Sequence, residues 1–232
     1  MSIADKLVTV YENQQKVFDA GKEAKRQAFW SALQNKGKRT DYSYAFYKDT
    51  WLATFQECPP VYDIKPKTSS NMFNGWNTTS KTLDLVEFLE ECGVTLDFSD
   101  CTSFNRTFES NTSIGHVGVM DIRKGTNFTN TFAYAGIDTI DKMIVDENLD
   151  FSAIFTYYST LKNITFEGNI GKALNMSACK NLTNASAESV IYHLKDLTGA
   201  TSLTIKFHAD VTSALTAEQK AEITRRNWTL AT

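Results

Sequence analysis

The sequence predicts an α/β protein: an N-terminal amphipathic helix, then a solenoid of stacked repeats with short parallel strands, closed by a small α/β cap at the C-terminal end. Three observations predict this organisation. The chain begins with a proline-free amphipathic pattern, a five-position pattern then recurs three times at intervals of 24 and 23 residues, and a helix-capping motif follows near the end. The expected segments are the helix (1–36), an aromatic-rich linker (37–66), the repeat region (67–185) and the cap (186–232).

The N-terminal segment carries a heptad pattern. From Ser2 to Gln34, apolar and small residues recur at alternating spacings of four and three, as along the seam of a coiled coil. We interpret the segment as an attachment element. It is either a short parallel coiled coil that joins identical chains, with a homotrimer favoured, or a single helix docked on a larger partner; packing on its own domain is a third interpretation. The seam residues are Ile3, Leu7, Val10, Gln14, Val17, Gly21 and Ala24.

The linker is rich in aromatic residues, and all three prolines of the chain fall within it. Prolines interrupt regular structure, so a break is expected here. The aromatic residues have two interpretations: a contact surface for a partner or a glycan, or a collar of rings that covers the first turn of the following domain. The collar is the favoured interpretation. The candidate contact residues are Tyr42, Tyr44, Tyr47 and Trp51.

The repeat region is defined by one recurring pattern: apolar, any, apolar, two residues, a small or polar residue, two residues, Phe, three residues, Phe. Five positions that match in register three times are a specific signal of a repeat architecture. The residues that fill the three units are Leu96, Phe98, Cys101, Phe104 and Phe108, then Met120, Ile122, Gly125, Phe128 and Phe132, then Met143, Val145, Asn148, Phe151 and Phe155.

Each position of the pattern has a physical interpretation. The apolar–any–apolar triplet predicts a short strand whose alternate side chains face inward. The small or polar residue predicts a sharp turn, and the Phe pair at helical spacing predicts two rings on one side of a single turn. Because one unit cannot bury its apolar face alone, stacked units must create the core. Partial units are expected at residues 164–169 and 174–182. The expected core rings are Phe104, Phe108, Phe128, Phe132, Phe151 and Phe155.

A different pattern closes the chain. Apolar residues on one face predict a helix from Ala187 to Leu197, ended by Gly199. Alternation over residues 203–207 predicts a strand, and the motif Thr216-Ala-Glu-Gln219 is a capping box that opens a second helix. A stacked repeat needs an end piece to shield its last apolar face, and this segment has the size and amphipathicity for that role.

Composition and charge argue against several classes of partner. A net charge of −3 leaves no basic footprint for nucleic acid. No apolar run approaches the roughly 20 residues of a membrane helix, so no membrane insertion is expected. The first residues lack the pattern of a signal peptide, which predicts synthesis in a cytoplasm. In that compartment, reduced and buried thiols are expected at Cys58, Cys92, Cys101 and Cys179.

The sequence shows no pattern of catalytic or cofactor-binding residues. His116, His193 and His208 lie far apart and form no cluster with metal-ligand spacing. No nucleotide-binding or nucleophile motif occurs. Acidic residues recur near the repeat strands and could in principle pair as glycosidase carboxylates, but solvated turns explain them better. We therefore expect no enzyme activity, no cofactor and no metal.

The strand, the small residue, the Phe turn and the repeat period together resemble the BspA-like branch of leucine-rich repeats. Phe155, Leu161 and Ile164 show the related spacing Phe-x5-Leu-x2-Ile. The resemblance covers about residues 72–182 and implies a leucine-rich-repeat-like solenoid. The chain departs from that pattern by its low leucine content at strand positions.

A second resemblance spans the whole chain and rests on five strings, at residues 12–22, 29–30, 39–46, 62–66 and 227–231. These strings are similar to those of tail proteins of phages and prophages of Gram-positive bacteria. The resemblance implies a virion component of the tail fibre or baseplate, non-enzymatic, with the helix binding other tail proteins and the repeats displayed for attachment to a receptor, a cell-wall glycan or surface protein of the host. The alternatives are a purely structural tail or baseplate scaffold and a bacterial cell-surface adhesin.

Overall fold

The computed structural model describes residues 64–75, 83–91, 95–155, 157 and 160–231. All of them belong to the compact unit Thr40–Thr232. The predicted N-terminal seam and the candidate contact residues of the linker lie outside the described residues. The described part comprises the end of the linker, most of the predicted repeat region and the predicted cap.

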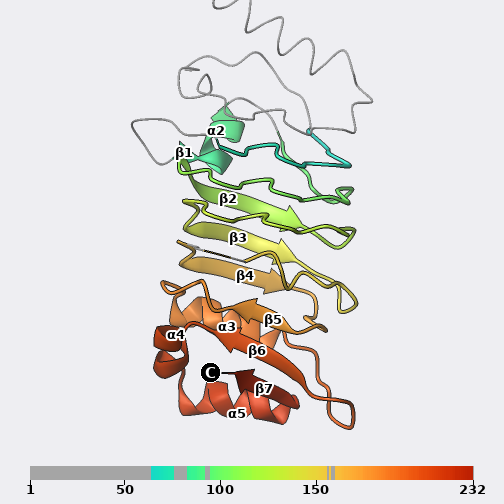
Figure 1. Ribbon diagram of the computed structural model, residues 1–232, viewed down its shortest axis with the longest axis vertical. Coiled ribbons are helices and arrows are strands. Elements are labelled where there is room, and N and C mark those ends of the chain that lie inside the picture. Colours follow the sequence, from blue (N-terminus) through green and yellow to red (C-terminus); the bar gives the residue numbers. More distant parts are fainter. Residues whose placement is uncertain (1–63, 76–82, 92–94, 156, 158–159, 232) are drawn as a thin grey trace, which may run out of the picture. The chain divides into compact units, whose positions relative to one another are not determined.

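The described chain is a mixed α/β structure with two sheets of short parallel strands, which confirms the predicted fold class in outline. The strands of each sheet pair in sequence order, β1-β2-β3-β4 in the first and β5-β6-β7 in the second. Figure 1 shows β2, β3 and β4 side by side. The bounds are β1 (Leu83–Asp84), β2 (Ile114–Asp121), β3 (Thr139–Ile144), β4 (Asn163–Glu167), β5 (Leu174–Met176), β6 (Leu203–Phe207) and β7 (Trp228–Ala231).

The helices of the described residues are α2 (Leu85–Glu91), α3 (Asn184–Tyr192), α4 (Ala209–Ala214) and α5 (Ala217–Arg225). The capping box that the sequence predicts at the start of α5 is present. Thr216 Oγ1 accepts a hydrogen bond from the Gln219 N–H at 3.2 Å, and Gln219 Oε1 accepts one from the Thr216 N–H at 3.0 Å. The strand predicted over residues 203–207 is β6.

The predicted helix Ala187–Leu197 corresponds to α3, but its bounds differ. Thr183 is the N-cap, and its hydroxyl accepts a hydrogen bond from the Ser186 N–H, so the helix begins before the apolar pattern does. The helix ends at Tyr192 with His193 as its C-cap, and Gly199 lies beyond it in a separate turn. The cap residue Thr183, rather than the spacing of apolar side chains, therefore determines where α3 starts.

Helix α3 also closes the open edge of the first sheet. The backbone N–H groups of Ile164 and Phe166 on β4 each donate a hydrogen bond of 2.9 Å to a serine hydroxyl, Ser186 for the first and Ser189 for the second. These serines lie on α3, which runs beside β4 (Figure 1). An unpaired strand edge is a template for unwanted pairing, and a helix that satisfies its N–H groups removes that hazard. The repeat therefore stops where the helix replaces a fifth strand.

The strands begin earlier than the sequence pattern predicts. The pattern places strand starts at Leu96, Met120 and Met143. In the structure β2 already begins at Ile114 and β3 at Thr139, so each methionine lies at the end of its strand. Leu96 forms an isolated bridge and belongs to no strand. Backbone pairing with the neighbouring coil extends each strand through residues that look like connections, because strand preference depends strongly on context.

The first two Phe pairs lie in successive tight turns, and the single helical turn predicted for them is wrong. The Thr107 N–H donates to the Phe104 carbonyl at 3.2 Å, and the Asn111 N–H donates to the Phe108 carbonyl at 3.1 Å. Between these two turns, Arg106 has a φ of 56°. Asn130 has the same φ in the second pair. A left-handed residue interrupts a right-handed helical path, so the backbone changes direction within the first two Phe pairs.

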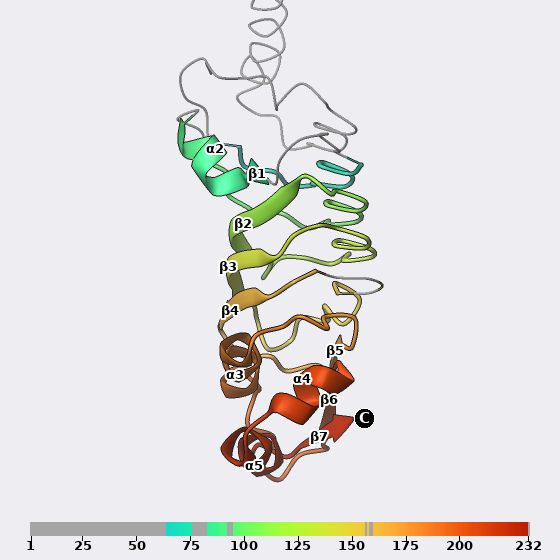
Figure 2. The ribbon, with the colours of Figure 1, turned by 90° about the vertical axis from the view of Figure 1, so that its left-hand side faces the viewer.

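Equivalent Phe rings stack on one another from each coil to the next, a coil being one strand with its following turns. The ring centroids of Phe104 and Phe128 are 5.5 Å apart, and those of Phe108 and Phe132 are 5.4 Å apart. The stack continues from Phe132 to Phe155 at 5.9 Å. These turns lie on the side opposite to strands β2 to β4 (Figure 2). All six predicted core rings are buried: Phe104, Phe108, Phe128, Phe132, Phe151 and Phe155.

Hydrogen bonds between coils accompany the stacked rings. The Phe104 N–H donates to the Asn127 carbonyl at 2.8 Å, and the Phe108 N–H donates to the Thr131 carbonyl at 2.9 Å. The buried hydroxyl of Thr131 lies 3.0 Å from the Phe104 carbonyl. Because these polar groups are paired, the turns can be buried without the cost of about 1–3 kcal/mol that each unpaired buried group would add.

The structure explains the glycine at the small position of the second unit and corrects the residue assigned to that position in the third unit. A β-carbon at Gly125 would lie 2.1 Å from Phe128 Cζ, so any side chain there would displace the Phe128 ring. In the third unit Leu149 makes the turn hydrogen bond that Cys101 and Gly125 make, and it is buried. Asn148, which the pattern assigns to this position, is exposed. The turn of the third unit therefore lies one residue later than the pattern places it, although the spacing from strand to Phe pair is the same as in the first two units.

Candidate functional site

Four residues at equivalent places in successive coils share a left-handed backbone conformation. Their φ angles, in chain order, are 64°, 54°, 57° and 65°. Hydrogen bonds between coils fix the order, because the Gly75 N–H donates to the Glu109 carbonyl and the Ser110 N–H donates to the Ala133 carbonyl, both at 2.8 Å. We call this set the left-handed column. It consists of Gly75, Ser110, Tyr134 and Tyr157.

The two tyrosines of the column form an exposed stacked pair. Their ring centroids are 5.5 Å apart and their planes differ by 20°. Tyr134 is 54% exposed and Tyr157 is 58% exposed, although both belong to a region whose Phe rings are buried. Exposed aromatic surface of this kind is characteristic of sites that contact a partner or ligand.

The fold does not require rings at these two positions. Gly75 and Ser110 occupy the same column without a ring. A left-handed conformation costs a bulky residue about 1–2 kcal/mol, which glycine avoids. Tyr134 and Tyr157 therefore place large apolar rings in solvent at a position where the backbone favours a small residue. Strained backbone combined with exposed apolar surface marks the pair as a candidate site.

A partly buried network of polar side chains supports the left-handed column at Ser110. Glu109, the residue before it, accepts hydrogen bonds from the side-chain amides of Asn74 at 2.9 Å and Asn130 at 3.2 Å. Arg106 pairs with the same carboxylate at 3.7 Å. The Glu109 carboxylate therefore joins three successive coils. It holds the backbone near Ser110 and near Tyr134, the next member of the column.

A second polar cluster lies on the first sheet. His116 of β2 lies between two aspartates, with Nδ1 2.6 Å from Asp84 Oδ2 and Nε2 2.8 Å from Asp141 Oδ1. Partial burial alone would lower the pKa of His116, but the hydrogen bonds to the two carboxylates outweigh it and raise the pKa. At Asp84 burial alone would raise the pKa, but the hydrogen bonds from His116 and from the backbone of α2 outweigh it and lower the pKa. The cluster joins β1 to β3 across β2, and we interpret it as a structural clamp.

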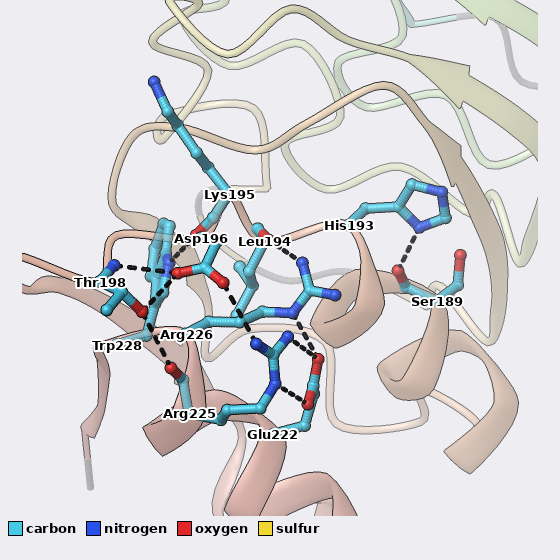
Figure 3. A network of polar contacts seen from close by, with 10 residues as sticks. All are labelled: Ser189, His193, Leu194, Lys195, Asp196, Thr198, Glu222, Arg225, Arg226 and Trp228. Carbon is cyan, nitrogen blue, oxygen red and sulfur yellow. Dashed lines mark hydrogen bonds and ion pairs between the residues drawn. The ribbon is translucent and has the colours of Figure 1, made fainter.

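The C-terminal cap contains a third polar network (Figure 3). Glu222 of α5 accepts hydrogen bonds from Arg225 at 2.7 Å and from Arg226 at 2.6 Å, which lowers the pKa of its carboxyl to about 2. Arg225 also reaches Asp196 at 3.1 Å, and the Trp228 indole N–H donates to the Lys195 carbonyl at 2.8 Å. Each guanidinium already has a carboxylate partner, so the network attaches α5 and β7 to the preceding loop and leaves no free cationic site.

Among the described residues, no group of three or more His, Cys, Asp or Glu side chains is arranged to hold a metal ion. Cys101 and Cys179 are buried, and burial raises the pKa of the Cys101 thiol. Cys58 and Cys92 lie outside the described residues. His193 and His208 remain apart from the His116 cluster: the first contacts the Ser189 carbonyl and the second caps α4.

Comparisons with known proteins do not assign this chain to a family. No protein-family model, curated protein or solved structure shows significant similarity to this chain. Within the part of the chain that the structure describes, no helix has the length and apolar character needed to cross a bilayer.

Sequence reasoning did not single out the tyrosine pair, but the signal for it is present. Tyr134 follows Phe132 by two residues, and Tyr157 follows Phe155 by two residues. The repeat pattern therefore extends by one further position, and in the first unit Ser110 fills it. An aromatic residue that recurs outside the predicted core positions is the feature that would have revealed the site.

Proposed function

We propose that this chain is a non-enzymatic tail protein of a phage or prophage of Gram-positive bacteria, and that its repeats form a solenoid displayed for attachment to the host surface. The similarity of five sequence strings to such tail proteins supports the assignment to a virion. In this proposal the N-terminal helix joins identical chains, as a homotrimer, or docks on other proteins of the tail fibre or baseplate.

Coil-to-coil order supports the solenoid. The strands of the first sheet pair in parallel, with Val117 opposite Ile140 and Ile140 opposite Ile164. The Phe rings on the other side of each coil stack with nearly the same sequence offset. A chain that repeats both contacts at one period is typical of a solenoid, in which each coil is stabilised by its neighbours.

The exposed Tyr134–Tyr157 pair is the observation that carries the binding role. It offers stacked apolar rings in solvent at positions where the fold accepts glycine or serine. One such pair binds weakly, but several copies held together by the N-terminal segment would bind a dense surface much more tightly. Multivalent weak binding of this kind needs no catalytic group.

Co-sedimentation of the full-length chain with intact cells and purified walls from a panel of Gram-positive strains tests the proposal. We expect the wild type to sediment with at least one strain, the Tyr134→Ala variant to lose that binding, and the Tyr192→Ala variant to keep it. Tyr192 lies on α3 and is 47% exposed, which makes it a matched control. Failure of the wild type to bind any strain, together with capture of other tail proteins, would replace the proposal by a purely structural scaffold.

A further inference from the structure

We infer that the free face of Tyr134 is a subsite for one pyranose ring of a neutral surface glycan. The inference rests on the proposed attachment function and names the chemistry of its ligand. It commits to a carbohydrate and not to a peptide, because the two classes need different arrangements of aromatic rings.

The two faces of the Tyr134 ring have different neighbours within the column. Tyr157 stacks on one face at a centroid distance of 5.5 Å. On the other side the next member of the column is Ser110, whose backbone N–H donates to the Ala133 carbonyl. Serine has no ring with which to continue the stack. The column therefore changes from aromatic to small side chains at Tyr134, and the ring remains 54% exposed.

The spacing of the coils sets where a ligand ring that continued the stack would lie. Successive strands of a parallel sheet lie about 4.8 Å apart, and the rings of the column repeat at a similar distance. A ligand ring that continued the stack would lie level with Ser110, one coil away from Tyr134. The Ser110 hydroxyl is a hydrogen-bond donor and acceptor at that level.

A pyranose suits this place because one of its faces presents C–H groups over an area close to that of a phenol ring, while its edge carries hydroxyls. The C–H face is apolar and packs on an aromatic face, and the hydroxyl edge stays in water or meets a serine. A proline-rich peptide instead docks in a groove between aromatic side chains. Tyr134 and Tyr157 are nearly parallel and in contact, so no groove lies between them.

Binding of small oligosaccharides to the full-length protein tests the inference. The probes are maltotetraose, cellotetraose and tetra-N-acetylchitotetraose, with decaproline as the peptide probe, each titrated by calorimetry. We expect at least one saccharide to bind with millimolar or tighter Kd, and decaproline not to bind. Tyr134→Ala should weaken the saccharide about tenfold, which corresponds to the loss of one aromatic stacking contact.

The variant Ser110→Tyr supplies a test that does not remove the platform. A ring at Ser110 would cover the free face of Tyr134 and remove the serine hydroxyl. The outer face of the new ring would lie level with Gly75, which has no side chain to bind a sugar hydroxyl, so saccharide binding should fall at least as much as in Tyr134→Ala. Tyr192→Ala should bind as the wild type does. Circular dichroism spectra and melting curves identify any variant that fails to fold, and Ser110→Thr keeps the hydroxyl without a ring as a second control.

Three results would overturn the inference: no saccharide binds, decaproline binds in their place, or binding survives both Tyr134→Ala and Ser110→Tyr. Its failure is separable from that of the proposed function. Cells bound through Tyr134 without saccharide binding would indicate a protein receptor and keep the attachment role. Saccharide binding by a protein that ignores every cell type would keep the subsite and remove the attachment role.

Discussion

Truncation of Phe132 tests whether the stacked rings hold the repeats together. Phe132 is 4% exposed and lies between two other rings, with centroids 5.4 Å from Phe108 and 5.9 Å from Phe155. Phe132→Ala removes contacts on both faces of the ring and leaves a cavity that three coils line. Buried Phe-to-Ala changes cost about 3–5 kcal/mol of unfolding free energy. We expect the upper part of that range, because each stacked pair adds about 0.5–1.5 kcal/mol beyond burial.

Urea unfolding followed by far-ultraviolet circular dichroism gives the unfolding free energy by linear extrapolation. Tyr134→Ala is the matched control, since Tyr134 belongs to the same turn but is exposed; we expect it to change stability by less than about 1 kcal/mol. A double-mutant cycle between Phe108 and Phe132 should show coupling of about 0.5–1.5 kcal/mol. A Phe132→Ala cost below about 1 kcal/mol, or one no larger than that of Tyr134→Ala, would refute the stacking account.

Three further changes test other parts of the structure. Gly125→Ala should cost about 1–3 kcal/mol, because its β-carbon would meet the Phe128 ring; an unchanged melting temperature would contradict this. The clamp at His116 should protect residues 83–91 from hydrogen exchange best between pH 3.8 and 6.5, since the raised pKa of His116 stabilises fully below 6.5 and the lowered pKa of Asp84 stabilises above 3.8. His116→Asn should remove the loss of protection above pH 6.5. An unaltered dependence of protection on pH would exclude the clamp. Glu222 has its pKa lowered from 4.5 to about 2, so its contribution is complete above 4.5 and is lost as the pH falls towards 2. Glu222→Gln should therefore reduce stability at neutral pH and lessen its fall in acid, and parallel pH profiles of variant and wild type would show that the ion pairs contribute nothing.

The core of the repeat could be predicted from the sequence because its signal is apolar and periodic. Phe104 and Phe128 are 24 residues apart, and their rings stack. Burial of such rings dominates the energetics, so their positions follow directly from the spacing. The capping box at Thr216 was predictable for another reason: both of its hydrogen bonds are made between residues three apart in the chain.

Strand bounds and turn conformation could not be predicted in the same way. Strand β2 contains Gly115, His116 and Gly118, which have little intrinsic preference for a strand, and pairing with the neighbouring coil keeps them extended. Arg106 and Tyr134 have left-handed φ angles that sequence preference would assign to glycine or asparagine. At Arg106 a hydrogen bond between coils, from its N–H to the Thr129 carbonyl at 2.9 Å, accompanies this conformation, and no local pattern records such a contact.

The candidate site could likewise be predicted only in part from the sequence. That the region repeats was evident from the sequence, but which side chains of the repeat face solvent was not. The linker residues that the sequence suggested as a contact surface lie outside the described residues. The recurrence of Tyr134 and Tyr157, each two residues after a Phe pair, was visible in the sequence, but their exposure, stacking and backbone conformation come from the structure.

Hydroxyl-radical footprinting of the wild-type chain, free and bound to walls of a susceptible strain, tests the binding role of the Tyr134–Tyr157 pair without any substitution. Tyr134, Tyr157 and Tyr192 are all exposed and oxidisable in the free protein. The account predicts that oxidation of Tyr134 and Tyr157 falls at least severalfold on binding while that of Tyr192 is unchanged. Equal oxidation of Tyr134 and Tyr157 in the free and wall-bound protein would contradict it.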